Sequence, residues 1–278
     1  MKSILFALCL VLAFQFSTSA QVQDNGPALP VREIRFEGSR HFSRAELIRD
    51  LKNCLDDEDE LYDAIRYKHC SQKLRSVMYS KGFLRATVDD IGIEPSGEKV
   101  VVVIRLSEGN RYRWGSFKIE GIRAFSEKEL IRMFGQQTGD IANATAFKVF
   151  LFDKLRTEYQ ERGYVQYDAE WEADFIDPVD SDAEGVVNAT VSIYEGKTFS
   201  VGRISVSGLE PVEGEALLAN FPMKSGDIYV PSKLKKWADA INKTGRFAFL
   251  DKDRHVQILT DEDAADIDLI ISLSKVQP

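Results

Sequence analysis

The sequence predicts an α+β protein made of three tandem copies of one small unit, each with the order strand, helix, helix, strand, strand. Recurring glycines mark the repeat. In each copy a short apolar strand ends at a glycine. These glycines lie 83 and 87 residues apart: Gly38, Gly121 and Gly208. In each copy a longer helix ends at a second glycine. These glycines lie 81 and 82 residues apart: Gly82, Gly163 and Gly245. Because two unlike landmarks keep nearly one spacing, we infer a repeated structural unit.

We place the units at residues 31–110, 111–197 and 198–278 of the chain. In each unit we expect a three-stranded mixed sheet covered on one face by two helices, which is an α+β layer. Each copy is long enough to hold a small core of its own. The copies follow one another almost without a spacer, which favours a semi-rigid rod over freely jointed units.

The first helix of a unit begins with a capping pattern in two of the copies. Ser43 is followed by Glu46, and Ser126 is followed by Glu129. In such a capping box the serine oxygen accepts a backbone N–H, and the glutamate reaches back to the serine's own N–H. In the third copy, Pro231 suits the first turn of the longer helix. The glycine that ends each longer helix can adopt the left-handed conformation of a helix cap.

The last two strands of a unit are predicted from alternation. Residues 165–175 alternate apolar and polar side chains, which is typical of a half-buried strand. Residues 267–273 repeat this alternation in the third copy. Residues 100–104 are apolar at every position, which favours a central strand.

Composition and the N-terminus indicate an exported globular chain. Hydrophobic residues make up 44% and charged residues 29%, with a formal net charge of −8. No cluster of Lys or Arg is present to hold nucleic acid, so we expect no nucleic-acid partner. Lys2, the apolar residues 4–14 and the small residues up to Ala20 predict a signal peptide over 1–20. Residues 21–30 are expected to be a flexible lead-in.

Export bears on the cysteines. Cys9 leaves with the signal peptide, so Cys54 and Cys70 remain. Two cysteines in an oxidising compartment indicate a disulfide, with two buried free thiols as the alternative. A metal site is less favoured, because His69 is the only nearby histidine and the spacing matches no zinc pattern.

The sequence offers no catalytic constellation. Its three histidines accompany no nucleophile-elbow pattern, and its glycines form no phosphate-binding loop. The acidic loops at 177–185 and 261–266 lack the ligand spacing of a calcium site. We therefore expect a protein that is not an enzyme and that has no cofactor, no metal and no small-molecule substrate.

A surface that binds protein remains. A three-stranded sheet has exposed edges, where an extended polypeptide can pair through its backbone without needing a particular sequence. The strand at 165–175 is the best candidate, because it is long, alternates and lacks Pro and Gly. Its acidic side chains would favour partners with cationic residues. The alternative is an edge used only between neighbouring units, or not used at all. The candidate partner-binding residues are Val165, Tyr167, Asp168, Glu170, Trp171, Glu172, Asp174 and Phe175.

The order of landmarks resembles the polypeptide-transport-associated (POTRA) domain. The matching features are the glycine-ended first strand with Phe-Ser and Leu after it, the Gly-Asp pairs at 139–140 and 226–227, and the Tyr-x-x-x-Gly helix ending at 159–163. The Glu-Gly pairs at 108–109 and 195–196, which close the first two units, complete the match.

This resemblance implies a function. POTRA domains form periplasmic arms of transporters that assemble or secrete outer-membrane proteins. It implies a non-enzymatic scaffold or chaperone-like arm at the outer membrane of a Gram-negative-type bacterium. The partners that it implies are unfolded or folded outer-membrane or envelope proteins. A separate membrane β-barrel is a further partner that the resemblance allows.

Two departures leave alternatives open. The first copy lacks the Gly-Asp pair and carries an acidic insert at 56–60 instead. The sequence also stops after the third copy, where the transporters of this family continue into a membrane barrel. The alternatives are a general docking module of the cell envelope and an N-terminal fragment of a barrel-containing transporter.

Overall fold

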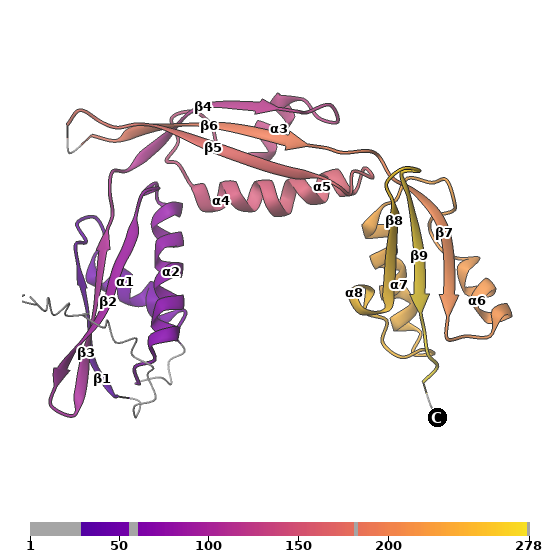
Figure 1. Cartoon of the computed structure of the whole chain (residues 1–278), viewed down its shortest axis with the longest axis horizontal. Coiled ribbons are helices and arrows are strands. Elements are labelled where there is room, and N and C mark those ends of the chain that lie inside the picture. Colours follow the sequence, from indigo (N-terminus) through magenta and orange to yellow (C-terminus); the bar gives the residue numbers. More distant parts are fainter. Residues whose placement is uncertain (1–28, 56–60, 181–182, 277–278) are drawn as a thin grey trace, which may run out of the picture.

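The computed structural model describes residues 29–55, 61–180 and 183–276. The predicted signal peptide, nearly all of the lead-in and the acidic insert lie outside the described residues. Within them the chain forms three α+β units that follow one another along an arch (Figure 1). No helix in this part of the chain combines the length and apolar character needed to cross a membrane.

The first unit has the predicted order of elements. Its sheet runs β1-β3-β2, with β1 parallel and β2 antiparallel to β3. The all-apolar third strand is therefore central, as predicted. The elements are β1 (Val31–Glu37), α1 (Arg44–Lys52), α2 (Ala64–Ser80), β2 (Thr87–Ser96) and β3 (Lys99–Ser107).

The second unit repeats this topology with the strand order β4-β6-β5. Its longer helix contains a π-helical turn at Phe150–Leu155 between two α-helical parts, which the sequence pattern did not indicate. The other elements are β4 (Tyr112–Glu120), α3 (Glu127–Phe134), α4 (Ala144–Val149), α5 (Arg156–Gln160), β5 (Asp168–Ile176) and β6 (Gly185–Tyr194).

The third unit has the strand order β7-β9-β8 and adds one short helix, α8, that was not predicted. The mixed three-stranded sheet with helices thus occurs in triplicate, which confirms the predicted fold class. The elements are β7 (Ser200–Ser207), α6 (Pro211–Leu218), α7 (Pro231–Lys243), α8 (Lys252–His255), β8 (Val256–Asp261) and β9 (Asp266–Ser272).

The helix caps follow local sequence. Ser126 accepts from the Glu129 backbone N–H at 3.3 Å, and the Glu129 carboxylate accepts from the Ser126 N–H at 2.8 Å. Ser43 and Glu46 form the same capping box, and Pro231 occupies the first turn of α7. These predictions are confirmed because both partners of each cap lie within one helical turn.

The strand predicted from Val165 begins three residues later, at Asp168. Turn hydrogen bonds occupy the intervening backbone: Val165 N–H donates to Gly163 and Tyr167 N–H donates to Tyr164. Val165 packs against the core of the third unit, and buried Tyr167 donates its hydroxyl to the Leu151 carbonyl at 3.1 Å. The apolar alternation therefore continues through a turn, so Val165 and Tyr167 are not edge-strand residues.

Each unit has its own hydrophobic core. The core of the second unit is aromatic: Trp114 lies 5.2 Å from Phe147, and Phe147 lies 5.2 Å from Trp171, measured between ring centroids. The cores of the first and third units are more aliphatic and are built around β3 and β9. Three separate cores agree with three units that close independently.

A buried glutamate closes each of the first two units. Glu195, 2% exposed, accepts from the backbone N–H groups of Arg123 and Ala124 at 2.7 and 2.9 Å, and from the Tyr159 hydroxyl at 2.9 Å. Burial alone would raise the pKa of Glu195, but these hydrogen bonds outweigh it and lower that pKa. Glu108 caps the loop after β1 in the same way. The glutamate of each Glu-Gly pair thus fixes the loop after the first strand to the end of the unit.

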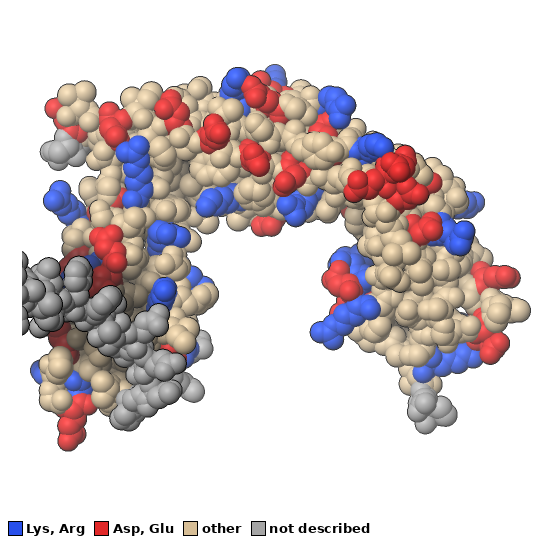
Figure 2. Space-filling model, in the orientation of Figure 1, with Lys and Arg blue, Asp and Glu red and all other residues tan. Residues whose placement is uncertain are grey.

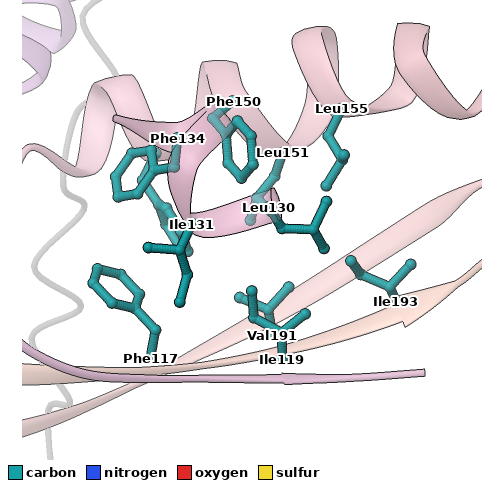
Figure 3. Close-up of a pocket in the computed structure, with 11 residues that line it drawn as sticks. Phe117, Ile119, Leu130, Ile131, Phe134, Phe150, Leu151, Leu155, Val191 and Ile193 are labelled. Carbon is teal, nitrogen blue, oxygen red and sulfur yellow. The ribbon is translucent and has the colours of Figure 1, made fainter. Parts of the chain in front are cut away.

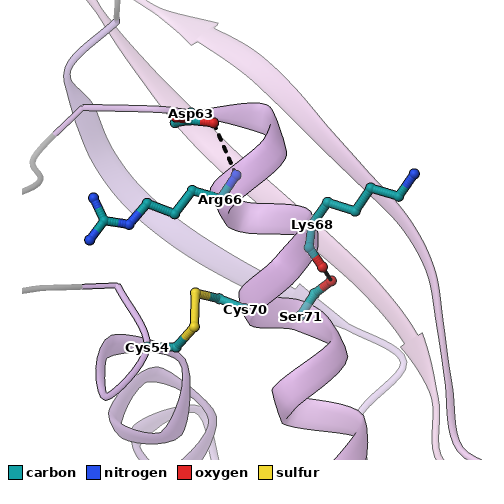
Figure 4. Close-up of a disulfide and its surroundings, with 6 residues drawn as sticks. All are labelled: Cys54, Asp63, Arg66, Lys68, Cys70 and Ser71. Atoms are coloured by element: carbon teal, nitrogen blue, oxygen red, sulfur yellow. Dashed lines mark hydrogen bonds between the residues drawn. A yellow bond between two sulfur atoms is a disulfide. The ribbon is translucent and has the colours of Figure 1, made fainter. Parts of the chain in front are cut away.

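A disulfide joins the two helices of the first unit (Figure 4). Cys54 follows α1 and Cys70 lies inside α2, with a Cα–Cα distance of 5.5 Å. Cys70 is fully buried, so the bridge forms part of the core. It ties the helices together at either end of the segment that carries the acidic insert.

Replacing both Cys54 and Cys70 with Ala is expected to destabilise the first unit by about 3 kcal/mol, because a closed loop of this length restricts the unfolded chain. Hydrogen exchange of α1 and α2 amides measures the loss. The intact mass of the wild-type chain without reductant should be lower by two hydrogen atoms than after reduction. A full reaction of both thiols with a thiol reagent in the native protein would contradict the bridge.

Glu195→Gln is expected to cost about 2 kcal/mol near pH 7, because a charged acceptor of several hydrogen bonds is replaced by a neutral amide. Since the folded pKa lies below the ordinary value of 4.5, this stabilisation is present at neutral pH and is lost as the pH falls through the folded pKa. Urea unfolding followed by tryptophan fluorescence measures it, because Trp114 and Trp171 both lie in the second unit. Glu158→Gln, at an exposed position, is the control. An equal loss of unfolding free energy in Glu195→Gln at neutral and acid pH would contradict this role of Glu195.

Candidate protein-interaction surface

Strand β5 forms one edge of the second sheet. It pairs with β6 on one side, and no described strand pairs with its other side. The antiparallel register places Glu170 opposite Ser192, Glu172 opposite Thr190, and Asp174 opposite Asn188. This confirms the sheet position that a strand-pairing surface needs.

The direction of the backbone groups follows from β6. The Gly185 N–H donates to the Arg111 carbonyl at 2.8 Å, so Gly185 and every second residue after it face β4. The residues between them face β5 and form hydrogen-bonded pairs with Glu170, Glu172 and Asp174. The helix-facing residues of β5 therefore direct their N–H and C=O groups outward: Ala169, Trp171, Ala173 and Phe175.

The two faces of β5 differ in character. Trp171 and Phe175 point toward the helices and are half-buried in the aromatic core. On the other face, Glu170 and Glu172 form no ion pair with any described residue, whereas Asp168 lies 3.9 Å from Arg156. Figure 2 shows acidic side chains spread along the surface of the second unit where β5 runs. The open edge is therefore bordered by uncompensated negative charge.

Six of the eight predicted residues lie on β5, and the other two lie before it. The sequence analysis missed a cluster at the end of the strand. Asp177 follows β5 and accepts from the Tyr112 hydroxyl and from Arg85 of the first unit, at 3.0 Å for the ion pair. The Arg85 guanidinium lies 4.4 Å from the Phe175 ring centroid. The hydrogen bond from Tyr112 lowers the pKa of Asp177, and burial raises the pKa of Tyr112.

The two joints between units share one backbone arrangement. The carbonyl of Gly82 accepts from Tyr112 N–H at 2.9 Å, and the carbonyl of Gly163 accepts from Phe199 N–H at 2.9 Å. Gly163 has a φ of 86°, and an added Cβ would lie 2.8 Å from Ile228. The helix-ending glycine is therefore also the contact point with the next unit, and a side chain there would be strained and crowded.

The side chains of the two joints differ. At the second joint, Phe199 replaces Tyr112 and has no hydroxyl to donate. Instead, the backbone N–H of Ser232 in α7 donates to Glu161 at 2.9 Å, and the Ser232 hydroxyl donates to the same carboxylate. The ionic cluster of Arg85, Tyr112 and Asp177 is thus specific to the first joint.

Two of the histidines take part in structural hydrogen bonds. Nδ1 of His41 lies 2.7 Å from the buried Glu108 carboxylate, and Nδ1 of His255 accepts from Asp251 N–H at 3.0 Å. Among the described residues, no group of three or more His, Cys, Asp or Glu side chains is arranged to hold a metal ion.

Three tandem α+β units, joined by backbone hydrogen bonds and each built on a three-stranded mixed sheet, define a class of modular repeat proteins. The family model described as "Surface antigen variable number repeat", the POTRA model, matches residues 29–109 and 112–196, more than half of the chain. The chain belongs to the POTRA family.

Curated relatives and a solved structure agree with this family. A Treponema pallidum protein named as an outer membrane protein assembly factor is 23% identical over 235 residues, covering 81% of this chain and 28% of that protein. The outer membrane protein assembly factor BamA of Neisseria meningitidis is 19% identical over 234 residues, with the same coverages. The chain thus spans less than a third of these relatives.

The structural comparison covers all three units. A crystal structure of Haemophilus influenzae BamA POTRA3-5 matches with a TM-score of 0.64 and 16% identity, covering 92% of this chain and 100% of that one. At this identity the match establishes the fold, and it includes the third unit, which lies beyond the residues that the family model matches.

Asp177→Ala is expected to loosen the first joint, because it removes the acceptor shared by Arg85 and Tyr112. Distances between spin labels in the first and second units should broaden, and proteolysis near residues 108–111 should become faster. Labels across the second joint should be unaffected. Asp180→Ala, which removes another carboxylate from the same loop, is the control, and equal broadening in both variants would refute the cluster's role.

Proposed function

We propose that this chain is a non-enzymatic, periplasmic arm that binds outer-membrane or envelope proteins during their assembly or secretion. Membership of the POTRA family and the similarity to outer membrane protein assembly factors support this role. Export by the predicted signal peptide would place the arm in the periplasm. Its partners would be unfolded or folded proteins that present an extended segment.

The observation that carries the proposal is the open edge of β5. Four successive helix-facing residues direct their backbone groups outward, so an added strand would gain hydrogen bonds without needing a particular sequence. This suits an arm that handles many clients. The joint cluster at Phe175 and Asp177 holds the end of the edge in place, which reduces the ordering cost of binding.

Charge would select among clients. Glu170 and Glu172 flank the edge without an ion-pair partner in the described residues, so a client strand with Lys or Arg opposite them would be favoured. A strand rich in Asp or Glu would be disfavoured for the same reason. The surface would therefore show little selectivity for the sequence of a client strand and more selectivity for its charge.

Ala173→Pro is expected to weaken client binding about fivefold, because it removes one outward N–H, worth about 1 kcal/mol, while leaving the bonds to β6 intact. Ala173→Ser keeps the N–H at the same position and serves as the matched control. Fluorescence anisotropy with an unfolded outer-membrane barrel protein diluted from urea measures the affinity. Equal affinity of the proline variant and the wild type, with the fold preserved by circular dichroism, would rule out pairing at this edge.

A proline at Glu170 would not serve the same purpose. The backbone of Glu170 faces Ser192 in β6, so proline there would break the sheet itself. The choice of position 173 therefore separates loss of binding from loss of structure.

A further inference from the structure

A second open edge lies on the opposite side of the same sheet, along β4. The first half of β4 is covered by its own unit: Gly139 N–H donates to the Trp114 carbonyl at 2.8 Å, and Trp114 N–H donates to the Asp140 carbonyl at 2.9 Å. Beyond Gly115 this cover ends. In the described part of the chain, the backbone of residues 117–120 has hydrogen-bond partners only in β6.

The first unit indicates which backbone groups face outward here. Ile34 lies four residues before Gly38, and its carbonyl accepts from the Arg44 guanidinium on the outer side of β1, at 3.2 and 3.4 Å. Phe117 lies four residues before Gly121, in the same place of the second unit. The backbone groups of Phe117, and of the alternate residue Ile119, therefore face away from the sheet.

An apolar pocket adjoins this edge (Figure 3). Phe117 and Ile119 line it from β4, Ile131 and Phe134 line it from α3, and Phe150 closes it from the longer helix. The free space inside is about 10 Å³, enough for one water molecule. An apolar side chain of a partner would therefore rest on the rim of the pocket or push the rim side chains aside. Phe117, Ile131 and Phe134 are only half-buried and form that rim.

The first unit blocks the corresponding site and the second does not. Arg44, the first residue of α1, covers the edge of β1 and also pairs with Glu33 at 2.9 Å. The first residue of α3 is Glu127, whose carboxylate cannot donate to the Phe117 carbonyl. The second unit thus has an acidic side chain where the first has a guanidinium. A basic residue of a partner would be complementary at this point.

We propose that the pocket and the open edge of β4 bind an extended segment of a partner polypeptide. This segment has apolar side chains at two alternate positions and a Lys or Arg beside them. The site goes beyond the β5 edge of the proposed function, because it lies across the sheet and selects for apolar character as well as charge.

The spacing of the apolar residues follows from strand geometry. Side chains at alternate positions of an added strand lie on the same face as Phe117 and Ile119, next to the pocket rim. The side chains between them face the other side of the sheet and are free to vary. The partner's basic residue would take the place that Arg44 holds in the first unit.

Glu127→Arg tests the site, because it recreates in the second unit the block seen in the first. The probe is a short fluorescein-labelled peptide with Phe and Leu at alternate positions, Thr between them and Lys at both ends. We expect Glu127→Arg to weaken its binding to the full chain at least about tenfold. Glu127→Gln, which removes the charge without adding a guanidinium, should weaken binding much less. A peptide with Asn in place of Phe and Leu should give no protection from hydrogen exchange at the amides of Phe117 and Ile119.

Hydrogen exchange locates the peptide. Protection at the amides of Phe117 and Ile119 supports the proposal, and protection at Trp171 and Ala173 instead would overturn it in favour of the β5 edge. Failure of the peptide to bind the wild-type chain, or equal binding to Glu127→Arg, would also overturn it. Ala173→Pro should leave the protection at Phe117 and Ile119 unchanged, so this site and the β5 edge succeed or fail separately.

Discussion

The central position of the third strand in each sheet is the constraint that governs this molecule. Because β3, β6 and β9 each pair on both sides, the other two strands of every unit have one side that pairs with no described strand. A sheet of this size cannot close on itself, so its edges must be covered by the chain or remain available for pairing. What distinguishes the three units is how each covers its edges.

Part of each first-strand edge is covered at or near the joints. The glycine that ends a longer helix accepts a hydrogen bond from a residue at or just before the start of the next unit's first strand. A loop of that next unit covers the start of the same strand. The first unit goes further, because Arg44 occupies the exposed carbonyl of Ile34. The second unit has no such cover beyond Gly115, and the outer side of its other edge strand, β5, also pairs with no described strand.

Local patterns made the elements predictable, and long-range pairings did not. Ser126 and Glu129 are three residues apart, so their capping box could be read directly from the sequence. The strand start at Val165 was predicted wrongly, because alternation does not distinguish a strand from a turn whose side chain packs into the next unit. The contact between Arg85 and Asp177 spans 92 residues, so no local pattern could indicate it. Likewise, which backbone groups of β5 face outward depends on its register with β6.

Phe175 and Asp177 belong at once to the end of β5 and to the contact with the first unit. Under the proposed function, occupancy of this edge and the angle between the first two units would therefore be parts of one equilibrium. A client that prefers one angle between the first two units shifts the arm toward that angle by the same free energy with which the angle strengthens the client's binding. By the same reciprocity, a force that bends the arm at this joint would release a client bound at the edge.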